Sequence, residues 1–150
     1  MSETRREWSV RTAAAGDLDA VLAIERSWPT MTQWSRKLFE DELSSDRSRF
    51  FLVERDAVVL GFGCARLLPP EAELLEIAVA PASARKGLGR ALLSRLHDEA
   101  RAAGCSKIFL EVRESNAPAR ALYAAFGYRI VGRRPKYYND EDALLMEAPL

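Results

Sequence analysis

Residues 74–112, LLEIAVAPASARKGLGRALLSRLHDEARAAGCSKIFLEV, decide how the chain folds. The segment opens with a short apolar run, Leu74–Val79, which has the length of a strand. From Gly89 onward, leucines and alanines recur on one helical face, and Gly104 stands where a left-handed cap would end the helix. Ile108–Val112 is again β-branched and apolar. A strand, a helix and a strand of these lengths predict a right-handed parallel crossover.

A basic turn with two glycines, Arg85–Arg90 (RKGLGR), joins the first strand to the helix. Gly87 and Gly89 let the backbone approach a ligand with no Cβ in the way, and the first N–H groups of the helix attract an anion. The turn therefore favours a phosphate or pyrophosphate. A dinucleotide fingerprint would need a third glycine at Leu92, and a P-loop would need Lys-Ser/Thr after Gly89, so neither motif is present. A helix cap with a solvated basic end is the alternative on this turn alone.

Composition bounds the class of protein. The 150 residues fit one domain, residues 1–150, and 48% hydrophobic content with zero net charge is typical of a globular protein rather than a general nucleic-acid surface. No apolar run approaches the ~20 residues that span a membrane, and the first residues lack the apolar segment of a signal peptide. We therefore expect a cytoplasmic protein with no membrane or nucleic-acid partner. Cys64 and Cys105 have no metal-binding spacing and are expected to be buried thiols.

The remaining elements surround this central unit. Leu38 and Phe39 are expected to face inward from the second helix, and His97, beside two acidic residues, is expected to lie in solvent. Strands first, a crossover, then more strands predict a mixed α/β or α+β sheet with helices on both faces. We expect strands at Trp8–Thr12, Phe50–Glu54, Val58–Leu68, Tyr128–Gly132 and Ala143–Glu147, and helices that start near Gly16-Asp17, Ser35 and Ser115-Asn116.

Nearly the whole chain, most strongly the segment from Glu73 to Tyr128, resembles the GNAT superfamily of acetyl-CoA-dependent N-acetyltransferases. The resemblance implies one GNAT domain, a mixed and mostly antiparallel sheet whose central parallel strands splay apart to admit acetyl-CoA, and direct acetyl transfer in a ternary complex. Within the superfamily the chain is most similar to the RimI type, which acetylates the N-terminal alanine of a ribosomal small-subunit protein. The motifs that carry the similarity are IAVAP (77–81), RKGLGRALL (85–93), LEVRESN (110–116), ALYAAFGY (121–128), Tyr137-Tyr138 and EDALLM (141–146).

The resemblance also implies how acetyl-CoA would be held. The backbone of Ile77, Ala78 and Val79 would run along the pantetheine arm, and Asn116, which is equally an ordinary helix cap, would contact the cofactor. Ala84 stands where the family pattern has Gln or Arg, a departure for which Arg85 can compensate. No metal is implied. We expect the pyrophosphate to be held, mainly through backbone N–H groups, by Arg85, Lys86, Gly87, Leu88, Gly89 and Arg90.

Two carboxylates, Glu76 and Glu111, interrupt the central strands, where a charge is usually paired or functional. From the pattern alone, Glu111 can instead pair with Arg113 on the same face, and Glu76 can lie at an edge. The resemblance makes Glu111 the first candidate for the base that takes the amine proton, and Glu76 the second. It makes Tyr123 the candidate acid that protonates the CoA sulfur and a cofactor contact, although a core tyrosine is the plainer interpretation.

The resemblance places Trp34, Tyr137 and Tyr138 in the acceptor site, with packing beneath a loop as the alternative for Trp34. Acidic residues after the tyrosine pair could hold a basic second residue of the substrate. The predicted function is N-α-acetylation of the N-terminal alanine of a ribosomal protein. The alternatives are a GNAT enzyme that acts on protein lysines or a small-molecule amine, and an acyl-CoA-binding module without turnover.

Overall fold

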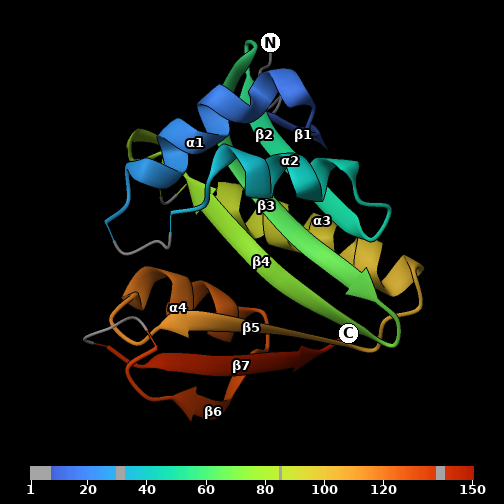
Figure 1. The fold of residues 1–150 in the computed structure, drawn as a ribbon, viewed down its shortest axis with the longest axis vertical. Coiled ribbons are helices and arrows are strands. Elements are labelled where there is room, and N and C mark those ends of the chain that lie inside the picture. The colour runs from blue at the N-terminus through green and yellow to red at the C-terminus, as the bar shows by residue number, and fades with distance from the viewer. Residues whose placement is uncertain (1–7, 30–32, 85, 138–140) are drawn as a thin grey trace, which may run out of the picture.

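The computed structural model describes residues 8–29, 33–84, 86–137 and 141–150, and these form a seven-stranded sheet with helices on both faces (Figure 1). The strands are β1 (Ser9–Thr12), β2 (Ser48–Arg55), β3 (Val58–Leu68), β4 (Glu71–Val79), β5 (Lys107–Arg113), β6 (Arg129–Arg134) and β7 (Ala143–Pro149). Their order across the sheet is β1-β2-β3-β4-β5-β7-β6. Neighbouring strands are antiparallel except β4 and β5, which are parallel, so the predicted mixed, mostly antiparallel sheet is confirmed.

The helices lie on the sheet in two pairs. α1 (Leu18–Arg26), which follows a 3-10 turn at Ala15–Asp17, and α2 (Arg36–Ser44) cover one face. α3 (Leu88–Ala102) and α4 (Ala117–Ala125) pack on the other face. In the part of the chain that the structure describes, no helix is long and apolar enough to cross a bilayer.

Each face of the sheet has its own hydrophobic core. Under α1 and α2, the rings of Phe39, Phe50 and Phe62 pack together with centroids 5.7 to 6.1 Å apart. On the other face, four leucines of α3 are buried against the sheet, and each contributes roughly 1.5–3 kcal/mol by leaving water. These contacts fix the start of α3 beside the end of β4. The four leucines are Leu88, Leu92, Leu93 and Leu96.

The second helix starts as predicted but turns a different face inward. Ser35 caps α2 by accepting a hydrogen bond from the N–H of Leu38 at 3.2 Å. Phe39 is fully buried, whereas Leu38 is 47% exposed, so the inward prediction for Leu38 is wrong. Consecutive helical side chains point about 100° apart, so α2 buries Phe39 alone of the two.

His97 is buried, so its predicted position in solvent is wrong. It lies one turn after Leu93 on the core face of α3, whereas the neighbouring Asp98 and Glu99 point away from the core. The acidic residues beside it in sequence therefore gave no information about its environment. The predicted end of the helix is confirmed, because Gly104 has φ 94° and the N–H of Cys105 donates to the carbonyl of Ala100 at 2.9 Å.

The two parallel strands pair only at their beginnings and then separate. The β4–β5 register runs from Glu71 opposite Lys107 to Glu73 opposite Phe109. Beyond that point β4 bulges: its register with β3 shifts so that Leu75 is the extra residue, and such a bulge bends the strand and increases its twist. The strands diverge toward their carboxyl ends, as Figure 1 shows. The splay that the resemblance implied is therefore confirmed.

Candidate active site

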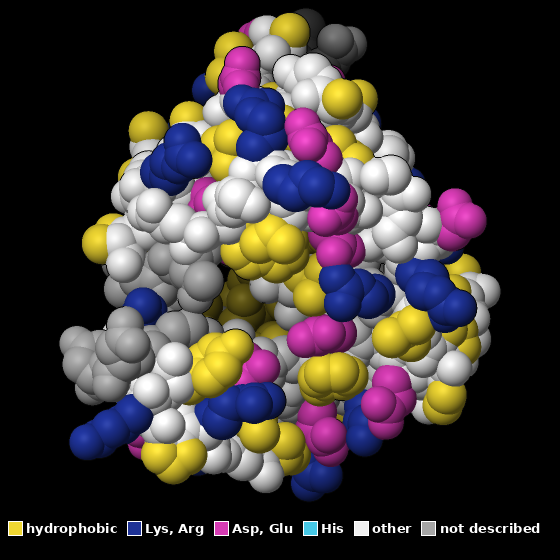
Figure 2. Space-filling view, viewed as in Figure 1, with side chains coloured by type: hydrophobic (Ala, Val, Ile, Leu, Met, Phe, Trp, Pro, Cys, Tyr) yellow, Lys and Arg dark blue, Asp and Glu magenta, His cyan; other side chains and the backbone are white. Residues whose placement is uncertain are grey.

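The surface is hollowed where β4 and β5 separate. Figure 2 shows this hollow on the side of α1 and α2, with hydrophobic side chains at its floor and charged side chains near its rim. Along the hollow, the β4–β5 pairing has ended at Glu73, so within the described residues the backbone edge of β4 beyond that point is available to a ligand. Ile77, Ala78 and Val79, the residues predicted to line the pantetheine arm, all lie on this stretch of β4.

The glycine turn meets the same end of β4. Gly87 has φ 84°, a left-handed conformation that a residue with a side chain rarely adopts, and it precedes Leu88 as the cap of α3. The first N–H groups of α3 therefore point out of the helix end without intrahelical partners. Arg90 lies against α4, with its guanidinium carbon 5.9 Å from the centroid of the Phe126 ring. Arg85 lies outside the described residues.

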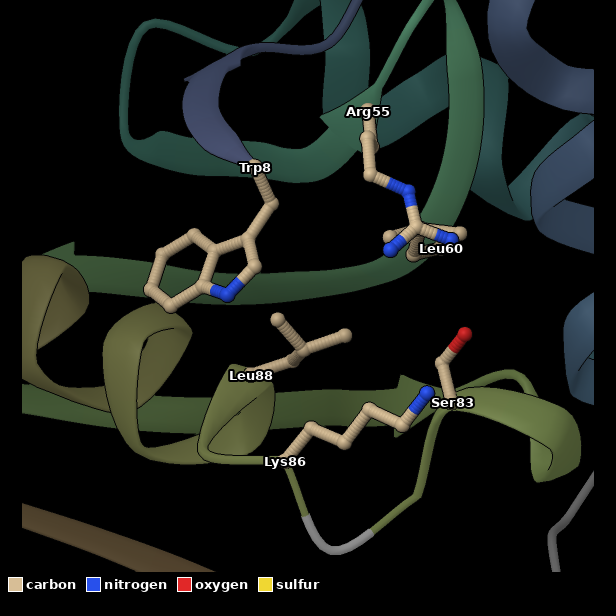
Figure 3. Close-up of a pocket in the computed structure, with 6 residues that line it drawn as sticks. All are labelled: Trp8, Arg55, Leu60, Ser83, Lys86 and Leu88. Atoms are coloured by element: carbon tan, nitrogen blue, oxygen red, sulfur yellow. The ribbon is translucent and has the colours of Figure 1, made fainter. Parts of the chain in front are cut away.

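The side chain of Lys86 does not lie where the sequence predicted, with the other residues of the turn at a pyrophosphate site. Its side chain lines a separate hollow of about 200 Å³ on the β3 side of the turn, where its amine approaches Ser83 and the Arg55 guanidinium enters from the opposite wall (Figure 3). Trp8, Leu60 and Leu88 complete the lining. The Lys86 side chain thus points into this separate hollow.

The side chain of Glu76 is buried beneath α1, although the residue lies on the stretch of β4 beyond the end of its pairing with β5. The bulge at Leu75 turns both residues toward α1 and α2, and Glu76 is only 8% exposed. Burial raises the pKa of its carboxyl well above the ordinary value, and a hydrogen bond to Glu25 and the charge of Glu25 raise it further. Glu25 is fully buried on α1 and accepts a hydrogen bond from the N–H of Trp34 at 2.8 Å. Sequence reasoning missed Glu25, although a glutamate among the core-facing positions of α1 was the available signal.

Glu76→Gln is expected to stabilise the protein at alkaline pH. Because the folded pKa of Glu76 lies above the unfolded value, the folded state binds the extra proton, and stability falls as pH rises through the interval between the two values. The substitution removes that loss, so the free energy of unfolding at pH 8 should rise by at least ~1 kcal/mol, with little change at pH 4.

Urea denaturation at both pH values measures this difference. Glu40→Gln, on the exposed side of α2, is the matched control and should change stability at neither pH. A Glu76→Gln protein that is less stable than the wild type at pH 8 would show that the carboxylate is stabilised in the fold, contrary to this expectation.

Glu111 faces the same side of the sheet as α1 and α2. Along β5, Ile108, Leu110 and Val112 are buried in the core under α3, so Glu111 points the opposite way. Its Oε2 lies 2.6 Å from Nε of Arg134, a partner that the strand pattern did not indicate.

Arg134 links Glu111 to the predicted acceptor loop. Its guanidinium carbon lies 5.2 Å from the centroid of the Tyr137 ring, so the structure brings Glu111 and Tyr137 into one group. Arg113 pairs with Glu141 at 3.2 Å, and the Glu141 carboxylate also accepts the N–H of Ser115 at 2.5 Å. Tyr138 lies outside the described residues. Sequence reasoning missed Arg134, because its partner is two strands away in the sheet.

A third carboxylate, Glu73, lies beside Glu111 where β4 and β5 part. Burial raises the pKa of Glu73, the Arg66 guanidinium opposes that rise, and the charge of Glu111 adds to it. Glu73, Glu76 and Glu111 thus all face the side of the gap that α1 and α2 cover. Because the raised pKa of Glu76 keeps that carboxyl protonated, of the three only Glu73 and Glu111 can offer negative charge to a cationic molecule there.

Tyr123 and Asn116 come from α4 on the opposite face. Tyr123 is 6% exposed and packs in the core under α3, so the structure agrees with the plainer interpretation of a core tyrosine as far as packing goes. Asn116 caps α4 as predicted, accepting a hydrogen bond from the N–H of Ala119 at 3.3 Å. The cofactor roles of both residues stay predictions.

Trp34 lies half-buried beside α2, with its ring centroid 5.1 Å from that of Phe39. Packing, the alternative interpretation, therefore describes its contacts, and its part in an acceptor site stays a prediction. Trp28, which sequence reasoning did not select, ties the end of α1 to the end of β4 by donating its indole N–H to the carbonyl of Val79 at 2.8 Å. Within the described residues, no group of three or more His, Cys, Asp or Glu side chains is placed to hold a metal ion.

Comparison with known proteins identifies the family. A model of the acetyltransferase (GNAT) family matches residues 18–128, which is most of the chain. The chain belongs to the GNAT family. It is 37% identical over 138 residues to the ribosomal protein bS18-alanine N-acetyltransferase of Escherichia coli K12, an alignment that covers 89% of this chain and 92% of that protein.

Solved structures agree with the GNAT assignment. The crystal structure of the ribosomal-protein-S18-alanine N-acetyltransferase from Escherichia coli matches with a TM-score of 0.85 and 36% identity, covering 95% of this chain and 93% of that one. The structure of Ard1 from Thermoplasma volcanium matches with a TM-score of 0.88 and 25% identity, covering 97% and 99%. GNAT enzymes use acetyl-CoA as acetyl donor, so the predicted class of reaction and the predicted fold are both confirmed.

Proposed function

We propose that this GNAT domain, residues 1–150, acetylates the N-terminal alanine of the ribosomal small-subunit protein bS18 with acetyl-CoA as donor. The observation that carries the proposal is the gap between β4 and β5, which has an open strand edge and a helix N-terminus on one side and carboxylates on the other. The alignment with the Escherichia coli enzyme, which is 37% identical and spans most of both chains, supports the choice of acceptor. A ribosomal acceptor would place the reaction in the cytoplasm.

The residues around the gap fit acetyl-CoA. The open edge of β4 at Ile77–Val79 offers backbone N–H and C=O groups to the amides of the pantetheine arm, as an added strand would use them. The left-handed Gly87 and the free N–H groups at the start of α3 suit the pyrophosphate. We infer that Leu88, Gly89 and Arg90 contribute mainly through their backbone. Lys86 acts through its backbone as well, since its side chain points into the neighbouring hollow.

Acetyl transfer forms a C–N bond, breaks a C–S bond and moves two protons. The carboxylate of Glu111 takes the proton that the α-ammonium group must lose, directly or through a water. The hydroxyl of Tyr123 donates a proton to the departing sulfur, which leaves as a thiol. The attacking nitrogen loses its second proton as the tetrahedral intermediate collapses, and that proton restores the Tyr123 hydroxyl through solvent. Glu111 is preferred over Glu76 as base, because Glu76 is buried and holds a proton in the folded state, whereas Glu111 is paired with Arg134. The amine then attacks directly, with no covalent enzyme intermediate.

The charge of the acceptor side favours a basic peptide. Glu73 and Glu111 line the side of the gap by which an amine must enter, and a free N-terminus carries a positive charge below its pKa of about 8. Glu76 faces the same side but holds a proton, so it adds no charge. Tyr137, held beside Glu111 by Arg134, gives the peptide an aromatic contact at the same place. We infer that Trp34 and Tyr138 extend this acceptor site.

Thiol release from acetyl-CoA with two acceptors tests the proposal. One peptide has a free N-terminal alanine followed by basic and aromatic residues, and the other has the same sequence with a blocked N-terminus and an added lysine. Turnover on the free terminus alone is the expected result. Turnover on lysine alone would move the function to a lysine acetyltransferase, and no turnover on either would leave a small-amine enzyme or a binding module, which a CoA titration separates.

A further inference from the structure

Helix α4 ends in a glycine cap that places Tyr128 directly against Tyr123. Gly127 has φ 89°, its N–H donates to the carbonyl of Ala124 at 3.0 Å, and the N–H of Tyr128 donates to the carbonyl of Tyr123 at 3.0 Å. This is the Schellman pattern, in which the residue after the glycine packs back onto the last turn of the helix. The two tyrosine rings lie 5.5 Å apart at 51°. Tyr128 therefore touches both the backbone and the ring of Tyr123.

His97 holds Tyr128 from the neighbouring helix. Its Nε2 lies 2.7 Å from the hydroxyl oxygen of Tyr128, and both side chains are buried. The imidazole also meets the Phe126 ring edge-on at 5.5 Å. Burial lowers the pKa of His97 to about 4 and raises that of Tyr128, so the hydrogen bond joins two neutral groups at physiological pH. A contact of this kind connects α3, which carries the glycine turn, with α4, which carries Tyr123.

The fold alone does not explain this buried polar pair. His97 lies on a face of α3 that is otherwise leucine and alanine, and replacing both partners of a buried hydrogen bond by apolar groups of the same shape is close to neutral for stability. A leucine and a phenylalanine would fill the same space. A directional bond, in contrast, fixes the rotation of the Tyr128 ring, and through ring contact that of Tyr123.

We propose that His97 and Tyr128 are positioning residues that hold the ring of Tyr123 in the orientation in which its hydroxyl meets the departing sulfur. The inference rests on the proposed role of Tyr123 as acid. Neither His97 nor Tyr128 touches the reacting atoms. His97 acts through Tyr128, and Tyr128 acts through Tyr123. Misplacing a reacting group by about 1 Å can cost up to 100-fold in rate, so loss of this bond is expected to reduce turnover without weakening binding.

Kinetics of four variants test the proposal. Tyr128→Phe and His97→Leu each remove the hydrogen bond, and each should lower kcat about tenfold while the KM values for acetyl-CoA and peptide stay within about twofold. His97→Gln, whose amide nitrogen replaces Nε2, should recover most of the loss. In the background of Tyr123→Phe, adding Tyr128→Phe should cost nothing more, because no hydroxyl is left to position.

Cys105→Ala is the matched control, because Cys105 follows the capping glycine of α3 as Tyr128 follows that of α4. It should keep full kcat. Tyr128→Phe with unchanged kcat, or with the same fractional loss in the Tyr123→Phe background, would overturn the inference and leave N-α-acetylation standing. Unchanged kcat in Tyr123→Phe itself would refute both the role of Tyr123 as acid and the role of His97 and Tyr128 in positioning it. Absence of any peptide turnover by the wild type would refute the proposed function. If His97→Leu does not fold, Tyr128→Phe and the double variant decide the question.

Discussion

Tyr123→Phe is expected to lower kcat about 100-fold and to leave the affinity for CoA within about threefold. A positioned general acid contributes about 10²–10⁴-fold, and the lower end applies here because a thiol, with a pKa near 8.5, is already a good leaving group. The substitution keeps the ring that packs under α3 and removes one hydroxyl, so the contacts that hold α4 remain. Steady-state kinetics with the free-alanine peptide and a direct CoA titration give the two numbers.

Thermal denaturation of the same variant separates chemistry from folding. Loss of one buried hydroxyl should cost about 1 kcal/mol at most, which leaves the protein folded at the assay temperature. If kcat stays at the wild-type value, the sulfur takes its proton from another donor or from water. If CoA affinity falls as far as kcat does, Tyr123 binds the cofactor and has no separate role in the chemistry.

The central crossover could be predicted from sequence because its signals are local. Glycines with positive φ at 87 and 104, the leucine face between them and two short apolar runs identify the strand, turn, helix and strand without reference to the rest of the chain. The splay of the strands came from the resemblance. The bulge at Leu75 accompanies the splay but contains no glycine or proline. The sequence of β4 therefore gives no signal that the Glu76 side chain turns beneath α1.

The parts of the site that sequence reasoning missed depend on long-range contacts. Glu25 and Glu76 lie on different elements, and only the packed structure shows that both are buried together. Arg134 reaches Glu111 across β7, a pairing set by the strand order β5-β7-β6. The solvent position predicted for His97 was wrong for a related reason. Residues next to each other on a helix point in different directions, so the acidic residues beside His97 in sequence do not share its surroundings.

Glu111→Gln is expected to lower kcat/KM for the peptide about 30-fold at pH 7. This is less than the 10²–10⁴-fold typical of a general base, because part of the α-amine is already neutral at that pH. The amide keeps the shape of the side chain but cannot take a proton, and it leaves Arg134 without its carboxylate. An α-amine has a pKa of about 8, so at pH 9.5 most of the peptide is neutral before it binds. The loss in kcat/KM should therefore shrink to a few-fold at pH 9.5, because the α-amine has already lost its proton to solvent.

Glu147→Gln is the matched control for this pH profile. Glu147 lies on the same face of the sheet, opposite Phe109 on the adjoining strand, and pairs with Lys107 and Arg129 at the end where β4 and β5 are still joined. It should change kcat/KM at neither pH. A deficit of Glu111→Gln that is equal at pH 7 and pH 9.5 would mean that the carboxylate acts by holding Arg134 and the Tyr137 loop in place. The proton would then have to leave through another group, and Glu73, whose raised pKa owes part of its shift to the charge of Glu111, is the carboxylate on which to test that route.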